Sequence, residues 1–278
     1  MAVVLALGGA LAWGVGDFLG GVASRRLAVL TVLVVSQAIG LAALLVWVAA
    51  SRESFPGLVE LLPAALAGIA GLVGLGALYR GLAVGAMGIV APISAASPIV
   101  PLAVDAAKGD VPAALQWLGI ALVLTGIAVL SREPSGSTQG GGLAAGAGLA
   151  VLAALGFGLF IVGIDAGADE SATWAMVAAR TASVSIGAIL ALALSTSLRP
   201  SREMLPILVG VGIFDTGASV LVAAATTYGA AGIVAVLSAL YPVVTIVLAR
   251  LVLGERLSAS RRAGGAVALT GAALVAAG

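Results

Sequence analysis

Long apolar segments separated by short polar breaks make up nearly the whole chain. An α-helix rises about 1.5 Å per residue, so about 20 apolar residues span the hydrocarbon core of a membrane. The uncharged run from Thr216 to Ala249 is too long for one crossing, and Tyr228-Gly229 is its natural break. The sequence therefore predicts ten membrane-spanning helices, near residues 2–22, 29–50, 59–82, 85–106, 113–131, 143–164, 172–196, 204–227, 229–252 and 261–278.

One segment of the sequence recurs 144 positions further on. Residues 85–100 and 229–244 are identical at ten of 16 positions, and the shared residues include Gly, Ser and Pro in the same order. Five predicted helices lie on each side of a Gly- and Ser-rich segment, and an odd number of crossings turns the second copy upside down. The predicted fold is an all-α polytopic membrane protein with ten transmembrane helices as two inverted five-helix repeats, residues 1–131 and 143–278, joined by a linker at 132–142.

Composition supports the same class of protein. The chain is 62% hydrophobic and 9% charged, whereas a soluble domain carries about 25% charged residues. The formal net charge of +1 predicts no nucleic-acid partner. The absence of Cys and His excludes disulfides, thiol nucleophiles and imidazole bases. We therefore expect no catalytic residues, no metal site and no cofactor, and the chain is not expected to be an enzyme.

Four ionisable side chains fall inside the predicted helices: Asp17, Arg80, Arg180 and Asp215. Each costs about 2.5–3.5 kcal/mol to insert, so each needs a partner, water or a function. The helical rise places Asp17 near the depth of Arg80, and Arg180 near the depth of Asp215. Two interpretations remain open for these expected pairs. They are either buried ion pairs that fix helix packing, or groups that face a central cavity and bind a substrate or a proton.

Proline residues interrupt the fourth and ninth predicted helices, at Pro92, Pro98 and Pro242. Each removes a backbone donor, and freed carbonyls at membrane depth are tolerated only against protein or a water-filled cavity. Ser94 and Ser238 recur beside these positions, although Ser also bonds back to its own helix. We predict that the three prolines act as gates. The predicted substrate-binding residues are Trp13, Asp17, Tyr79, Arg80, Ser94, Ser97, Arg180, Asp215, Ser238 and Tyr241.

Two short motifs point to a family. Gly254-Glu255-Arg256 precedes a Gly-rich final helix, and the first helix contains Trp13-Gly14-Val15-Gly16-Asp17-Phe18. On these residues the chain resembles the EamA-type branch of the drug/metabolite transporter superfamily, although Lys108-Gly109-Asp110 stands where the first half would carry Gly-Glu-Arg. The resemblance implies ten helices in two inverted repeats, a central cavity lined mainly by helices one, three, four, six, eight and nine, and cytoplasmic termini.

The distribution of Arg residues conflicts with that orientation. Most of them, including Arg25, Arg26, Arg261 and Arg262, fall on the side opposite the two termini. The positive-inside rule would make that side cytoplasmic. The orientation in the membrane stays open.

These features predict a secondary active transporter that exports a small metabolite or drug-like solute by alternating access. Proton coupling stays open, with Asp215 the first candidate carboxylate and Asp17 the second. The expected partners are a small-molecule substrate and membrane lipid, and the protein is expected as a monomer or homodimer. We expect it in the plasma membrane, as a multi-pass protein of a bacterial inner membrane.

Two alternative functions remain. An intramembrane aspartyl protease would use Asp17, within a Gly-x-Gly-Asp sequence, together with Asp215. Such an enzyme needs the two carboxyl groups within hydrogen-bonding distance of a shared proton or water. A non-transporting membrane scaffold or scramblase is the other alternative, and a dry, packed interior between the halves would favour it.

Overall fold

The computed structural model describes residues 1–84, 93–130, 143–253 and 258–278, with the side chains of Tyr79, 82–84 and 143–145 left undescribed. Pro92, the predicted linker and the Gly-Glu-Arg motif lie outside the described residues. The elements are α1 (Ala2–Ser24), α2 (Val29–Ser51), α3 (Leu62–Val84), α5 (Ile99–Lys108), α6 (Ala114–Leu130), α7 (Leu143–Ala168), α8 (Ala172–Ala193), η1 (Arg202–Met204), α9 (Leu205–Thr226), α10 (Ala231–Ser238), α11 (Tyr241–Leu253) and α12 (Ala259–Ala277).

The described part of the chain forms helices and no strands, as its apolar runs predict. Six stretches are long and apolar enough to cross a membrane: Ala2–Ser24, Val29–Ser51, Gly146–Ala168, Ala172–Ala193, Arg202–Thr226 and Ala231–Leu253. Two shorter apolar helices, Leu62–Leu78 and Ala114–Leu130, accompany them. The prediction of an all-helical, polytopic membrane protein is confirmed.

Helix ends fall where the local chemistry favours them. The Ser171 hydroxyl caps α8 by accepting the backbone N–H of Trp174 at 3.1 Å, and the Ser258 hydroxyl caps α12 in the same way through Arg261 at 3.3 Å. Gly109 ends α5 with φ +96°, a left-handed conformation that glycine adopts without a steric penalty. These residues fix where the three helices begin or end.

The expected ninth helix is two helices. The chain leaves α10 at Ser238 and enters α11 at Tyr241, so the predicted kink within one helix is a full interruption. Pro242 is the second residue of α11, a position where its missing N–H breaks no bond inside the helix. Pro98 stands directly before α5 in the same way, as the N-terminal cap residue.

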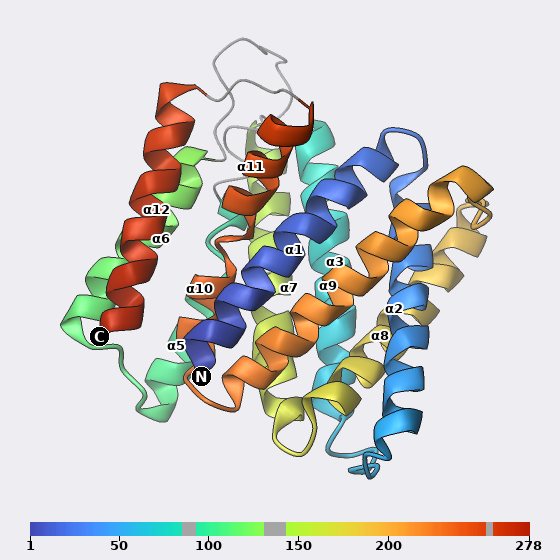
Figure 1. The fold of residues 1–278 in the computed structure, drawn as a ribbon, viewed down its shortest axis with the longest axis horizontal. Coiled ribbons are helices and arrows are strands. Elements are labelled where there is room, and N and C mark those ends of the chain that lie inside the picture. Colours follow the sequence, from blue (N-terminus) through green and yellow to red (C-terminus); the bar gives the residue numbers. More distant parts are fainter. Residues whose placement is uncertain (85–92, 131–142, 254–257) are drawn as a thin grey trace.

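Three helix pairs make the largest contacts in the bundle. α1 packs along α9, α3 along α7, and α6 along α12, while α2 packs on both α8 and α9. Figure 1 shows α6 and α12 at one end of the molecule and α2 and α8 at the other, with α1, α3, α7 and α9 between them. The central helices therefore surround the space in which a site can form.

Corresponding positions in the two halves make matching contacts. A methyl group on Gly14 of α1 would lie 2.8 Å from the carbonyl oxygen of Tyr241. A methyl group on Gly158 of α7 would lie 2.7 Å from the carbonyl oxygen of Ser97. Gly158 follows Gly14 by 144 positions, and Tyr241 follows Ser97 by the same 144. The distance that separates the repeated sequences thus also relates two contacts in space.

The pair α6 and α12 shows the same reciprocity. Gly119 faces Gly271, with 2.6 Å between the position of an added methyl group and the opposing carbonyl oxygen, and Gly126 faces Gly264 at 2.7 Å. As the number rises along α6 it falls along α12, so the two helices run antiparallel. Small residues at such a crossing let the backbones approach closely.

Candidate functional site

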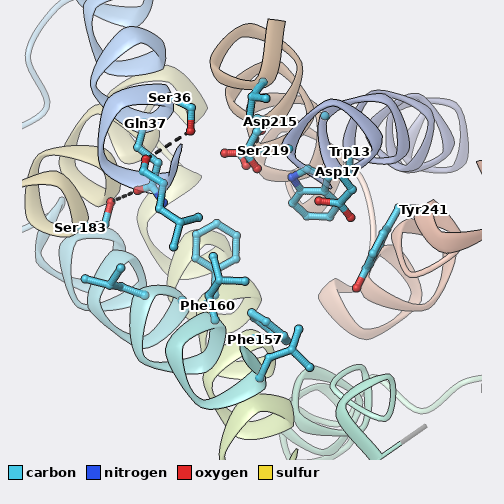
Figure 2. Close-up of a pocket in the computed structure, with 18 of the residues that line it drawn as sticks. Trp13, Asp17, Ser36, Gln37, Phe157, Phe160, Ser183, Asp215, Ser219 and Tyr241 are labelled. Carbon is cyan, nitrogen blue, oxygen red and sulfur yellow. Dashed lines mark hydrogen bonds between the residues drawn. The ribbon is translucent and has the colours of Figure 1, made fainter. Parts of the chain in front are cut away.

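A cavity of about 510 Å³ lies among the central helices. Its walls come from α1, α2, α3, α7, α8 and α9, from the start of α5, and from the residues on either side of the break between α10 and α11. Figure 2 shows polar residues on several sides of the cavity, with the rings of Phe157 and Phe160 on another. A cavity of this size is in the range that binds small molecules, about 300–1,000 Å³.

The cavity reaches one end of the bundle and stops short of the other. Its lining includes Ser24, the last residue of α1, and Val29, the first residue of α2. At the opposite end of α1, Ala6 and Ala10 are buried with Val222 of α9 in a hydrophobic core. The lining of the cavity therefore reaches the Ser24 end of α1, whereas packed apolar side chains close the other end, the sealed end.

An ion pair lies in the wall of the cavity. The Nη2 atom of Arg180 on α8 donates to the Asp215 carboxylate on α9 at 2.6 Å, and to the hydroxyl of Ser219 at 3.1 Å. The Ser219 hydroxyl donates in turn to the backbone carbonyl of Asp215 at 2.9 Å. The structure thus forms the expected pairing of Arg180 with Asp215 and adds a serine to it.

Both residues of this pair line the cavity, and the carboxylate is more exposed than the guanidinium. The side chain of Asp215 is 31% exposed, and that of Arg180 is 8% exposed. The Nε atom of Arg180 is buried and has no hydrogen-bond partner within the described part of the chain. A buried guanidinium beside a partly exposed carboxylate presents mainly negative charge to the space in front of it.

Asp17 adds a second carboxylate to the same cavity. Its side chain is exposed, and it is among the residues that line the cavity. Within the described residues no ion pair or hydrogen bond to Asp17 is formed, and the expected pairing with Arg80 is absent. Arg80 is exposed on the last turns of α3 and does not line the cavity, because a long side chain so near a helix end reaches outward.

A second polar link joins α8 to α2. The Ser183 hydroxyl donates to the side-chain oxygen of Gln37 at 2.5 Å, and both residues are buried. Ser36, the neighbour of Gln37, also lines the cavity. This link and the Arg180–Asp215 pair hold α8 between α2 and α9.

Aromatic rings occupy two parts of the wall. Trp13 of α1 and Tyr241 of α11 make an edge-to-face contact, with ring centroids 6.2 Å apart and an interplanar angle of 77°. Figure 2 shows Asp17 beside Trp13, with Tyr241 on the neighbouring helix. Phe157 and Phe160 of α7 supply an apolar wall across the cavity (Figure 2).

The sealed end carries polar contacts of its own. The buried carboxylate of Asp105 on α5 accepts the backbone N–H of Gly232 in the first turn of α10 at 2.5 Å. Lys108, also on α5, pairs with Asp165 on α7 at 3.6 Å. A carboxylate is favourable at a helix N-terminus, where unsatisfied N–H groups point outward. These contacts tie α5 to both α10 and α7 where the cavity is closed.

The predicted site residues fall into three groups. Those that line the cavity are Trp13, Asp17, Ser97, Pro98, Arg180, Asp215, Ser238 and Tyr241. Arg80, Ser94 and Pro242 are described but do not line it; Ser94 is buried one helical turn before Pro98. Pro92 and the side chain of Tyr79 lie outside the described residues.

Several lining residues escaped the sequence analysis: Ser36, Gln37, Phe157, Ser183 and Ser219. Two of them had a usable signal. Ser219 lies one helical turn after Asp215, on the same face of its helix. Phe157 lies 144 positions after Trp13, so the repeat itself pointed to it.

The arrangement suits binding better than hydrolysis. Asp17 and Asp215 both line the cavity, yet no hydrogen bond joins them within the described residues, and Asp215 is held by Arg180. A search of the described residues finds no group of three or more side chains suited to hold a metal ion. A cavity with charged side chains and apolar rings can hold a small molecule that has both polar and apolar parts.

A helical bundle that encloses such a cavity is the architecture of a membrane transporter. The chain matches the sequence model of the EamA-like transporter family over residues 1–132 and 144–277, and it belongs to that family. It is thus a multi-pass membrane protein and a transporter of the drug/metabolite type.

The fold also has a counterpart among solved structures. The chain superposes on a protein crystal structure with a TM-score of 0.82 at 18% sequence identity. The match covers 98% of this chain and 95% of that chain. At this identity the likeness concerns the fold alone. Comparison with curated proteins finds no match.

Proposed function

We propose that the protein is a secondary active transporter that exports a small metabolite or drug-like solute by alternating access. The observation that carries this proposal is the cavity itself, because it holds charged groups, extends to one end of α1 and is closed at the other end by packed side chains. A carrier must bind its solute in such a space and then expose it to the opposite face. Transport follows when the sealed end opens and the open end closes.

The mechanism rests on two inverted repeats, residues 1–131 and 143–278, joined by the segment 132–142. Two matches to the same family fall on these halves. The reciprocal contacts support the arrangement, since Gly119–Gly271 and Gly264–Gly126 are the same contact with the halves exchanged. Ten crossings follow if each half crosses five times. Related halves that pack antiparallel can exchange conformations, which gives the two access states similar energies.

The breaks beside Pro98 and Pro242 are the proposed hinges of this exchange. Each proline stands at the start of a half-helix that follows an interruption or turn, and Pro242 follows Pro98 by 144 positions. Helix segments separated by a break can tilt independently without breaking internal hydrogen bonds. Pro98 also lines the cavity, so movement at this point changes the space that a solute occupies.

If transport is coupled to protons, Asp17 is the better candidate than Asp215. Asp215 is held by Arg180 at 2.6 Å, and protonating it would break that ion pair. Asp17 faces the cavity and has no ion-pair partner in the described part of the chain. Asp17 can therefore take up and release a proton with less change to the packing of the helices.

The cavity disfavours the alternative functions. A protease would need both aspartates to share a proton, whereas one of them is already paired with an arginine. A scaffold needs no interior space, whereas about 510 Å³ stays open here. We place the transporter in the plasma membrane, with a bacterial inner membrane as the expected location.

Flux in proteoliposomes tests the proposal. Purified protein is first screened by thermal shift against metabolites and drug-like solutes, and each stabilising solute is then assayed for flux. We expect saturable flux of at least one such solute, which stops when Arg180→Gln breaks the ion pair with Asp215 in the cavity wall. Asp110→Asn, at an exposed position outside this cavity, is the matched control. Binding without flux in intact, correctly folded proteoliposomes would contradict transport.

A further inference from the structure

We infer that the cavity takes organic cations: a positively charged group lies beside Asp17, near the Trp13–Tyr241 pair, and an apolar body lies toward Phe157 and Phe160. The inference rests on the proposed transport function, because it names the substrate class of the same cavity. It stands on the balance of charge, the placement of the rings and the shape of the wall.

The balance of charge in the cavity is negative. Among the described residues that line it, the ionisable acidic and basic side chains are Asp17, Arg180 and Asp215. Arg180 and Asp215 neutralise each other at 2.6 Å, which leaves the Asp17 carboxylate uncompensated. An unpaired carboxylate at membrane depth is costly, so a cation or a proton is the favourable partner.

The exposure of the charged groups also favours a net negative charge at the cavity surface. The side chain of Asp215 is 31% exposed, whereas that of Arg180 is 8% exposed and its Nε atom is buried. The Asp215 carboxylate is therefore more accessible to a ligand than the guanidinium that neutralises it. Lys108 lies at the sealed end, and Arg80 does not line the cavity. The basic group of the described lining is thus Arg180, which is nearly buried and already paired with Asp215.

The rings beside Asp17 suit a cation. Trp13 precedes Asp17 by one helical turn, so both side chains lie on the same face of α1 (Figure 2). Tyr241 meets Trp13 at 6.2 Å between ring centroids. Indole and phenol rings attract ammonium groups through their negative faces, and the attraction grows where water is excluded. A carboxylate next to two such rings is a recognised way to hold a quaternary ammonium group.

The cavity wall opposite Asp17 is apolar and would contact an apolar part of the same ligand. Phe157 and Phe160 of α7 face the cavity together with Leu72 and Leu75 of α3. A small inorganic cation would leave this surface bare, whereas an arylalkyl ammonium would cover it. The volume of about 510 Å³ accommodates such a molecule.

Binding of three ligands that differ in charge and share their shape tests the inference. We would titrate the purified protein by calorimetry with benzyltrimethylammonium, with the neutral benzyl methyl sulfone and with the anionic phenylmethanesulfonate. The cation should bind at least about tenfold more tightly than either of the others, which corresponds to about 1.4 kcal/mol. Equal binding of cation and anion, or tighter binding of the anion, overturns the inference on the unmodified protein alone.

Two substitutions then locate the site. Asp17→Asn keeps the shape of the side chain and should raise the Kd of the cation at least about tenfold, while the Kd of the neutral sulfone stays the same. Trp13→Leu should weaken the cation about three- to tenfold, and Trp13→Phe should restore part of the loss. If Asp17→Asn fails to fold, Asp17→Glu, which keeps the charge, must retain selectivity for the cation over the anion. An unchanged cation Kd in folded Asp17→Asn contradicts the assignment.

The same measurements separate this inference from the transport proposal. Selective binding of the cation with no flux of any solute contradicts transport and leaves the cation site standing. Flux of a neutral or anionic solute, with no preference for the cation, contradicts the cation site and leaves transport standing.

Discussion

The Asp105 carboxylate accepts the backbone N–H of Gly232 at 2.5 Å, and through this bond the first half of the chain caps a helix of the second half. The position 144 residues after Asp105 is Ala249, which cannot make the corresponding contact on the other face. This carboxylate contact therefore has no counterpart at position 249. In an alternating carrier, such asymmetry favours the state that is sealed at this end.

Removing that carboxylate should loosen the sealed end. Asp105→Ala leaves a buried N–H unsatisfied, at a cost of about 1–3 kcal/mol to the closed state. A cysteine at Ala6, which is buried at the sealed end, reports the opening, and the chain contains no other cysteine. We expect labelling of Ala6→Cys by a membrane-impermeant maleimide to become at least about fivefold faster. Asp110→Ala is the control, and an equal acceleration there would contradict the closure role.

Breaking the ion pair should lower stability more than removing it whole. Arg180→Leu leaves the Asp215 carboxylate without its partner, and we expect a loss of about 1–3 kcal/mol, reduced from the fully buried case because Asp215 is 31% exposed. Arg180→Leu combined with Asp215→Leu should recover part of that loss. Thermal unfolding in detergent measures the stability of Arg180→Leu, of Asp215→Leu and of the double variant. A double variant that is as unstable as the sum of both single variants would exclude coupling between the residues.

The crossing of α6 and α12 should tolerate no added methyl group. Gly126→Ala forces the new methyl into the backbone of α12 at Ala268, so we expect a lower unfolding temperature. Gly264→Ala should lower the unfolding temperature by a similar amount, because Gly264 makes the same contact from the other helix. Gly148→Ala is the matched control, since nothing lies within 4 Å of its added methyl, and it should be neutral or slightly stabilising. If only the control lost stability, the close backbone contact between α6 and α12 would be contradicted.

Cation binding should weaken in acid. Asp17 binds a cation only when ionised, so protons and cations compete for the same carboxylate, and the Kd of benzyltrimethylammonium should rise as the pH falls. The other groups that face this position are Asp215, Arg180 and Tyr241. Asp17→Asn should remove most of the pH dependence, whereas a profile that persists unchanged would assign it to Asp215 instead.

Much of the fold followed from apolar patterning, because a membrane admits helices of a fixed length. The break at Tyr228-Gly229 separates α9 from α10 as predicted. The pairing of Arg180 with Asp215 was also predictable, because the helical rise alone gives the depth of a residue. The full interruption between Ser238 and Tyr241 was not, since proline in a pattern leaves kinks and breaks equally open.

The rotation of each helix was the information that the sequence lacked. Asp17 and Arg80 lie at similar depths, yet only Asp17 faces the cavity, because depth says nothing of the direction in which a side chain points. The Ser183–Gln37 bond joins residues 146 positions apart and depends on how α8 turns toward α2. The contact of Asp105 could not be predicted for the same reason, because its partner is the backbone N–H of Gly232 in the other half.

The account as a whole is tested most directly by a cysteine in the middle of the cavity. Leu72 lines the cavity about 15 Å along α3 from its start. In proteoliposomes of Leu72→Cys, a membrane-impermeant maleimide is added to one face or to the other, and unmodified Cys-free protein is the control. The account predicts labelling from both faces, slower from the sealed one and accelerated there by Asp105→Ala. Labelling from one face only, unaffected by Asp105→Ala, would contradict alternating access.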